Sequence, residues 1–89
     1  MDEAARIRQV LVDGLEIGSV ALIYEPSVRG PFLAGAADVQ LERLEMDSLA
    51  RMELCIAIEV ETGVSLTPDD LAAYATLGDL ARHIERSAA

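Results

Sequence analysis

The chain has 89 residues with 7 basic and 16 acidic side chains, a formal charge of −9. The acidity argues against nucleic-acid binding, which needs Lys and Arg at phosphates, and one His with one Cys supplies too few soft ligands for a metal site. No apolar run reaches the roughly 18–20 residues of a membrane span, the start at Met1 is acidic and unlike a signal peptide, and the lone Cys suits a reducing cytosol. We therefore expect a single small domain over residues 1–89, located in the cytoplasm.

The first predicted helix covers residues 3–17. Its apolar stripe consists of Ile7, Val10, Leu11 and Leu15, at the spacing of one helix face. Asp2 has the side chain of an N-cap, and Gly18 is typical of a helix end.

Residues 18–46 hold several Gly and Pro residues, so no long helix is predicted there. The run at 20–24 has the composition of a strand, but no second strand is available to pair with it. We expect Leu22 and Tyr24 to pack across helices instead, and residues 38–43 to form one helical turn. Three leucines are expected to attach this segment to the core: Leu33, Leu41 and Leu44.

Three further helices are predicted, over residues 48–61, 68–74 and 77–86. Asp47, Thr67 and Thr76 precede them as N-caps, and Gly63 ends the first of the three. The sum is a small all-α four-helix bundle with a long first loop and a short third helix.

Ser48, at the start of the clearest helix, has three interpretations. The first is that Asp47 or Ser48 only caps the helix. The second is that Ser48 Oγ bears a phosphoester, which the unpaired N–H groups of a helix start stabilise. The third, a catalytic nucleophile, would need His83 as its base and lacks a Gly-x-Ser-x-Gly elbow. We therefore expect a substrate of another enzyme, with no catalytic residues of its own.

The segment around Ser48 resembles the acyl carrier protein family, whose signature is Leu-Gly-x-Asp-Ser-Leu followed by a helix that often contains Glu-Leu. The matching positions here are Leu44, Asp47, Ser48, Leu49, Glu53 and Leu54. Residues 64–71 and 76–80 also resemble the starts of the third and fourth helices of that family, which has a long first loop as well.

The resemblance implies a carrier. Ser48 would accept 4′-phosphopantetheine from coenzyme A through a phosphopantetheinyl transferase, with Asp47 and Leu49 flanking the attachment site. The arm would hold acyl groups as thioesters for fatty-acid-like, polyketide or other secondary biosynthesis. The implied partners are an acyl- or aminoacyl-loading ligase or acyltransferase and a ketosynthase or another thioester-using enzyme. The carrier itself is expected to be a monomer.

Partner enzymes are expected to contact the helix that starts at Ser48. Met52 and Ile56 are expected to stay partly exposed there, although core packing is the alternative. Glu53 and Glu59, with Glu61, would meet basic partner residues, or form an ordinary solvated face. Arg51 would affect partner choice, or form a surface pair with Asp47. Cys55 is expected near the core, and His83 at the surface or its boundary.

Two positions depart from the family pattern. Glu45 replaces the usual Gly, so the turn is either remodelled or free of a positive φ. Thr62 replaces a large apolar residue, which predicts a smaller core nearby.

Two alternatives remain at this point. A peptidyl carrier would hold amino acids, but Asp directly before the serine favours the acyl type. A small helical interaction protein would use Ser48 only as a cap. Met1 and the closing residues 87–89 favour a free-standing protein over an excised domain.

Overall fold

The structure, a computed structural model, describes residues 2–88. Met1 and Ala89, on which the expectations about the two chain ends partly rest, lie outside the described residues. The chain forms α-helices α1 to α4 and 3₁₀ helices η1 to η3. In chain order these are α1 (Glu3–Ile17), η1 (Ala21–Tyr24), α2 (Pro26–Leu33), η2 (Leu41–Leu44), α3 (Ser48–Thr62), η3 (Pro68–Ala73) and α4 (Leu77–Ala88).

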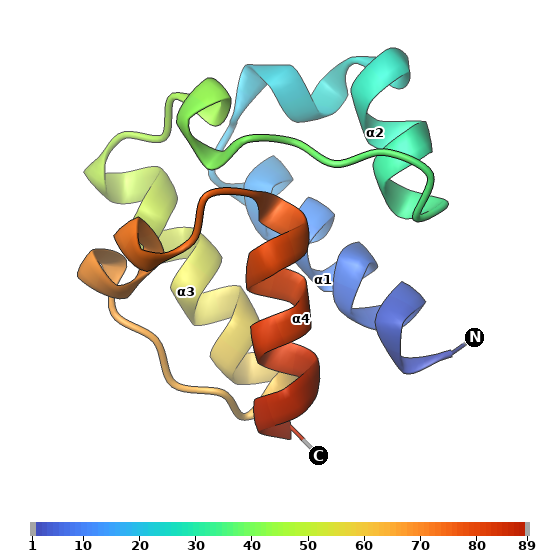
Figure 1. Cartoon of the computed structure of the whole chain (residues 1–89). Coiled ribbons are helices and arrows are strands. Elements are labelled where there is room, and N and C mark those ends of the chain that lie inside the picture. Colours follow the sequence, from blue (N-terminus) through green and yellow to red (C-terminus); the bar gives the residue numbers. More distant parts are fainter. Residues whose placement is uncertain (1, 89) are drawn as a thin grey trace.

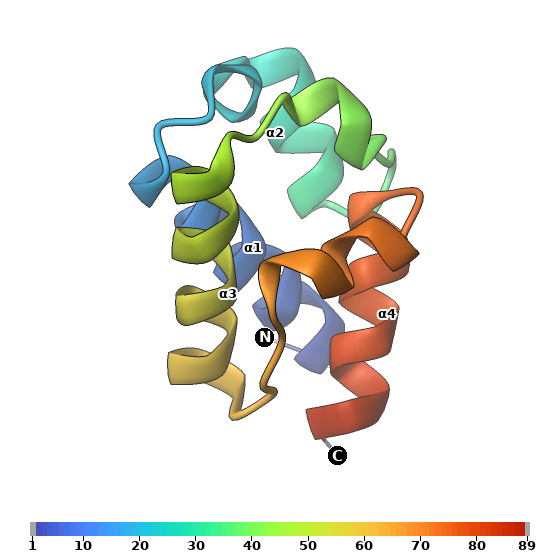
Figure 2. The same ribbon diagram turned by 90° about the vertical axis from the view of Figure 1, so that its left-hand side faces the viewer.

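The all-α bundle is confirmed: α1 packs against both α3 and α4 (Figure 1). The helices α2, η1 and η2 lie together at one end of the bundle, and η3 lies between α3 and α4 (Figure 2). The apolar stripe predicted for α1 forms part of the core, to which α3 and α4 also contribute buried apolar side chains. The side chains with no exposed area include Ile7, Leu11, Leu15, Leu54, Ile58, Leu77, Leu80 and Ile84.

Two glycines let α1 approach α3 closely. A Cβ atom on Gly14 would lie 3.0 Å from Leu54 Cδ1, and one on Gly18 would lie 3.1 Å from the Cα of Ala50. Both contacts are tighter than ordinary side-chain packing allows. Gly18 therefore fixes the position of the first turn of α3, which begins at Ser48.

The segment 18–46 is more regular than we expected, because it contains the eight-residue helix α2 as well as two 3₁₀ turns. Pro31 lies inside α2 and cannot donate a backbone hydrogen bond, which made a helix improbable from sequence. The helix forms because Phe32 is buried in the core, and such packing outweighs weak local propensity.

The anchors of this segment are partly those predicted. Leu41 and Leu44 are buried, whereas Leu33 is only partly buried. Ile23 fills the core at η1, while Tyr24 is exposed and donates a hydrogen bond from its hydroxyl to the Glu16 carbonyl at 3.0 Å. Of the pair expected to pack across helices, Leu22 is partly buried against the core, whereas Tyr24 reaches α1 only through its hydroxyl and stays exposed.

The predicted third helix is a 3₁₀ helix, η3, and not an α-helix. Its start was predicted correctly: Thr67 is the N-cap and Pro68 follows it at the first position. Asp70 completes a capping box, because its carboxylate accepts from Thr67 N at 2.8 Å while its own N–H donates to Thr67 Oγ1 at 3.3 Å. These bonds lower the pKa of Asp70.

The segment before η2 is joined to the start of α4. Asp38 Oδ1 accepts hydrogen bonds from Val39 N and Gly78 N, both at 2.8 Å. The backbone adds bonds from Leu77 N to the Val39 carbonyl and from Leu41 N to the Ala75 carbonyl. Thr76 caps α4 as predicted, since Asp79 N donates to its hydroxyl at 3.0 Å.

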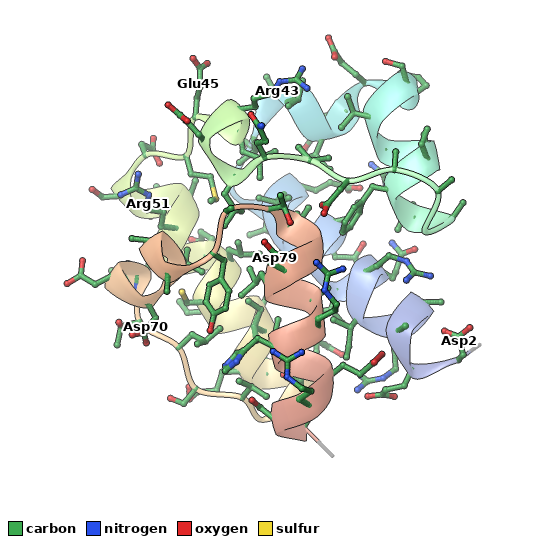
Figure 3. The ribbon with its side chains drawn as sticks, in the orientation of Figure 1. Asp2, Arg43, Glu45, Arg51, Asp70 and Asp79 are labelled. Atoms are coloured by element: carbon green, nitrogen blue, oxygen red, sulfur yellow. The ribbon has the colours of Figure 1, made fainter. Side chains whose placement is uncertain are left out.

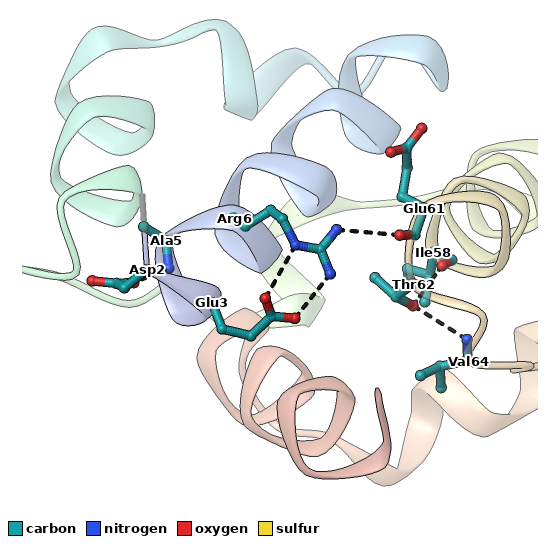
Figure 4. Close-up of polar contacts among 8 residues, drawn as sticks. All are labelled: Asp2, Glu3, Ala5, Arg6, Ile58, Glu61, Thr62 and Val64. Atoms are coloured by element: carbon teal, nitrogen blue, oxygen red, sulfur yellow. Dashed lines mark hydrogen bonds and ion pairs between the residues drawn. The ribbon is translucent and has the colours of Figure 1, made fainter. Parts of the chain in front are cut away.

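Polar contacts also join the ends of α1 and α3 (Figure 4). Arg6 donates to the Glu61 carbonyl at 3.2 Å. Thr62, half-buried, donates from its hydroxyl to the Ile58 carbonyl at 2.6 Å and accepts from Val64 N at 3.2 Å. Thr62 thus bonds to backbone groups at the end of α3, where we expected only a smaller apolar contact.

Gly63 ends α3 as predicted, in a left-handed conformation with φ of 75°.

Over residues 2–88, the helices are all too short or too polar to cross a membrane.

Candidate functional site

Asp47, and not Ser48, caps helix α3. The Asp47 carboxylate accepts from Ala50 N at 2.7 Å, and its carbonyl accepts from Arg51 N at 3.0 Å. Ser48 is exposed, and within residues 2–88 its hydroxyl makes no hydrogen bond. Because the neighbouring aspartate satisfies the helix end, the serine hydroxyl is available for chemistry.

The start of α3 suits an attached phosphodiester. The helix has 15 residues, and the backbone N–H groups of Ser48 and Leu49 donate to no group within the described residues. Such unpaired N–H groups, together with the positive end of the helix dipole, favour an anion at this position. The exposed Ser48 Oγ leaves the outward direction open for a long arm.

The turn before the site is strained at Glu45. This residue has φ of 49° and ψ of 45°, and its N–H donates to the Glu42 carbonyl at 3.2 Å. The turn therefore keeps the left-handed conformation that a glycine adopts freely. Of the two alternatives for this turn, the one in which Glu45 does without a positive φ is wrong, since φ is 49°.

One side of α3 is apolar and exposed. We call it the apolar face of α3, and it consists of Leu49, Met52, Ile56 and Val60, which are 64 %, 51 %, 52 % and 73 % exposed. The expectation that Met52 and Ile56 stay exposed is confirmed. Val60 lies one turn beyond Ile56, at the i, i+4 spacing that groups it with Met52 and Ile56, although it was not predicted as a partner-contact residue.

Acidic side chains flank the apolar face of α3. Glu59 and Glu61 are exposed and Glu53 is half-buried. The face continues onto α1, where a surface hollow of about 300 Å³ lies between the two helices. Ile17 of α1, 62 % exposed, and Ala57 of α3 contribute to its lining. The helix pairing alone joins Ile17 to this face, and no sequence signal places it there.

Arg51 lies away from the apolar face of α3. It lines a hollow of about 770 Å³ between η2, the start of α3 and η3, which we call the η2–η3 hollow. Its apolar lining comes from Leu41, Met46, Pro68, Leu71, Ala72, Tyr74 and Ala75, and charged residues at its edge are Glu42, Glu45, Arg51 and Asp69. Within residues 2–88, Arg51 forms no ion pair with Asp47.

Cys55 and His83 serve the packing of the bundle. Cys55 is buried, and burial together with the nearby Asp70 charge raises the pKa of its thiol. The His83 ring packs against Tyr74, with ring centroids 5.3 Å apart, and its Nε2 is 3.4 Å from Ser87 Oγ. Among the described hydrogen bonds none joins His83 to Ser48, so the pair that a serine hydrolase requires is not formed there.

A comparison with protein families matches residues 33–84 to the family described as phosphopantetheine attachment site. Neither the curated proteins nor the solved structures gave a significant match. The matched residues run from the end of α2 to the second half of α4 and include the whole of α3. Proteins of this family bind 4′-phosphopantetheine covalently and act as carriers. The chain belongs to the family of phosphopantetheine-carrying proteins.

Proposed function

We propose that the protein is an acyl carrier protein in which Ser48 is the attachment residue for 4′-phosphopantetheine. One observation carries the choice of residue: the Ser48 hydroxyl is exposed and unbonded at the start of α3 because Asp47 takes the capping role. Asp47 and Leu49 would flank the arm. Transfer from coenzyme A would form a phosphodiester at Ser48 Oγ and release the nucleotide portion.

The bound arm supplies a terminal thiol that forms thioesters. The chain's own part is to present that arm and to dock with enzymes. A tethered cargo has a high effective concentration at a docked enzyme, so the carrier needs no catalytic cleft of its own. The partners we propose are a phosphopantetheinyl transferase, a loading ligase or acyltransferase, and a ketosynthase or another thioester-using enzyme, in fatty-acid-like or polyketide biosynthesis in the cytoplasm.

The apolar face of α3 supports a docking role for Met52 and Ile56. Its four exposed apolar side chains form a continuous row along the helix, with Glu53 and Glu59 beside it. Exposed apolar rows with a charged edge mark protein interaction sites. We propose that partner enzymes bring basic residues to these glutamates and apolar residues to the row.

The acyl type is favoured over the aminoacyl type by Asp47 directly before Ser48. The η2–η3 hollow adds support, because it opens beside the start of α3 and has apolar side chains from Leu41, Met46 and Leu71. Its volume of about 770 Å³ falls in the range of small-molecule sites. An acyl chain would find apolar surface there.

The test is modification of the purified chain by a broad-specificity phosphopantetheinyl transferase and coenzyme A, followed by intact mass measurement. The native chain is expected to gain one phosphopantetheine, and Ser48→Ala none. Ser65→Ala, which removes an exposed serine from the loop after α3, is the matched control and should still be modified. No gain in the native chain, or a gain in Ser48→Ala, would contradict the assignment.

A second measurement separates acyl from aminoacyl loading. The modified protein is offered to acyl-loading and to aminoacyl-loading ligases with matched substrates. Loading of acyl groups supports the proposal, and loading of amino acids alone would make the protein a peptidyl carrier.

A further inference from the structure

Arg51 lies near the proposed attachment residue and, among residues 2–88, has no ion-pair or side-chain hydrogen-bond partner. Four of the seven arginines make ion pairs or side-chain hydrogen bonds, and they are Arg6, Arg8, Arg29 and Arg82. Within residues 2–88, Arg43, Arg51 and Arg86 make neither. Arg51 is exposed and belongs to the first turn of α3. A long charged side chain without a protein partner is free to pair with another group.

Helix geometry directs Arg51 towards Ser48. The two residues are three positions apart, which places them on adjacent sides of the helix with Cβ atoms about 5–6 Å apart. Side chains on a helix lean towards its N-terminus, so we expect the Arg51 side chain to extend back towards the turn that begins at Ser48. In Figure 3, Arg51 and Arg43 project on different sides of Glu45.

The charges around Ser48 leave Arg51 able to pair with an anion attached there. Asp47, four residues before Arg51 and its nearest candidate partner along the helix, is bonded to Ala50 N. Glu45 and Asp47 otherwise make the surroundings of Ser48 acidic, in a chain of net charge −9. A phosphodiester at Ser48 would add another anion to this acidic surrounding. Arg51 is the cation on the same helical turn that can offset it.

We propose that Arg51 pairs with the phosphodiester of the arm on Ser48 and acts as its positioning residue. This rests on the proposed attachment at Ser48. Because Arg51 also lines the η2–η3 hollow, the pair would hold the first part of the arm on that side of α3. The apolar face of α3, on the other side, would remain free for a docking enzyme.

The test compares thermal stability before and after modification. The quantity is the change in Tm on attachment of the arm, measured at low salt for the native chain, Arg51→Ala, Arg51→Lys and Arg86→Ala. In Arg51→Ala, attachment of the arm should change Tm by a value roughly 1–4 °C lower than in the native chain. In Arg51→Lys the difference from the native chain should be smaller. Arg86→Ala removes the same charge from the end of α4 and should leave the change as in the native chain. High salt should abolish the difference, because it screens an exposed pair.

A second measurement uses only the native chain and covers the case in which a variant is poorly modified. The NMR signal of the Arg51 side-chain Nε–H should shift between the unmodified and the modified protein, and that of Arg86 should not. The phosphorus signal of the arm should depend on salt in the native chain.

The proposal is wrong if Arg51→Ala lowers Tm equally in both forms, or if neither the Arg51 nor the phosphorus signal responds. Failure of the proposed function is a separate result, because the mass spectrum then shows no arm on Ser48 before any Tm is compared.

Discussion

At Glu45 the backbone adopts a left-handed conformation, which is unfavourable for an L-residue that has a side chain. Its φ of 49° places Cβ close to the following carbonyl oxygen, and a glycine avoids this contact. The side chain of Glu45 also adds a negative charge two residues before Asp47. The positive φ and the added negative charge therefore both lie in the turn that leads directly into Ser48.

We expect Glu45→Gly to raise the free energy of unfolding by about 1 kcal/mol, because the left-handed strain disappears. The gain is limited, since glycine also makes the unfolded chain more flexible. Urea unfolding followed by circular dichroism measures the change.

Glu45→Gln is the matched control for this residue. It removes the charge but keeps the Cβ atom, so it should show little of the gain. If Glu45→Gln stabilises the protein as much as Glu45→Gly, the carboxylate and not the backbone conformation is the cause. If Glu45→Gly destabilises the protein, the left-handed conformation at Glu45 is not a source of strain.

At the scale of the elements, the contact between Asp38 and Gly78 joins the segment before η2 to α4. A Cβ atom on Gly78 would lie 2.5 Å from Asp38 Oδ2, so no larger residue fits while Asp38 accepts the Gly78 N–H. These residues are 40 positions apart, and the contact helps close the end of the bundle around η2.

We expect Gly78→Ala to lower the free energy of unfolding by about 1–3 kcal/mol, because the displaced Asp38 carboxylate loses its backbone hydrogen bonds. Gly30→Ala is the control: it lies in α2 with nothing within 4 Å of the added Cβ, and should be neutral or stabilise by up to about 1 kcal/mol. In an Asp38→Ala background, Gly78→Ala should cost little, since the two residues act through one contact. Equal costs in both backgrounds would show that another contact is responsible.

The same contact predicts a dependence on pH. Burial alone would raise the pKa of Asp38, but hydrogen bonds from Thr76, Gly78 and Val39 outweigh it and hold the pKa below its usual value. A lowered folded pKa means that the contribution is present above the unfolded pKa of about 3.9 and is lost as pH falls through the folded value. The stability difference between the native chain and Asp38→Ala should therefore shrink from pH 7 to about pH 2.5. A difference that grows on acidification would contradict this.

At the scale of the whole molecule, the charge is unevenly distributed along the chain. Residues 1–44 carry 7 acidic and 4 basic side chains, a charge of −3, whereas residues 45–89 carry 9 acidic and 3 basic ones, a charge of −6. The second half contains Ser48 and the whole of α3. An acidic surface around the proposed attachment site would attract basic partner enzymes over some distance.

We expect the double variant Glu53→Lys with Glu59→Lys to lower kcat/KM for phosphopantetheinyl transfer on the order of 10-fold at low salt, because it reverses the charge beside the apolar face of α3. The measurement is the rate of mass gain at limiting carrier concentration. Added salt should slow transfer to the native chain and reduce the difference in kcat/KM between the native chain and the variant.

Glu25→Lys with Glu85→Lys makes the same change in net charge at the N-cap of α2 and in α4, and serves as the control. It should slow transfer far less. If both double variants slow transfer equally, overall charge and not the α3 surface governs the encounter. If neither does, the glutamates of α3 have no docking role with this enzyme.

Much of the fold could be predicted because its signals are local. The N-cap of each predicted helix and the buried stripes of α1, α3 and α4 follow from residues within four positions of one another. Helix α2 could not be predicted, since Pro31 argues against it and only the burial of Phe32 explains it. The 3₁₀ form of η3 could not be predicted from the sequence either, because its capping residues are also those of an α-helix.

The sequence by itself determined the bundle, the start of α3 at Ser48 and the resemblance to a carrier, because caps, periodicity and a short motif lie in consecutive residues. The tertiary structure decided which sides of α3 face solvent and which line a hollow. It placed Arg51 at the η2–η3 hollow and away from Met52 and Ile56, joined Ile17 to Val60, and paired Asp38 with Gly78. These relations connect residues far apart in the chain, so they exist only once the helices have packed against one another.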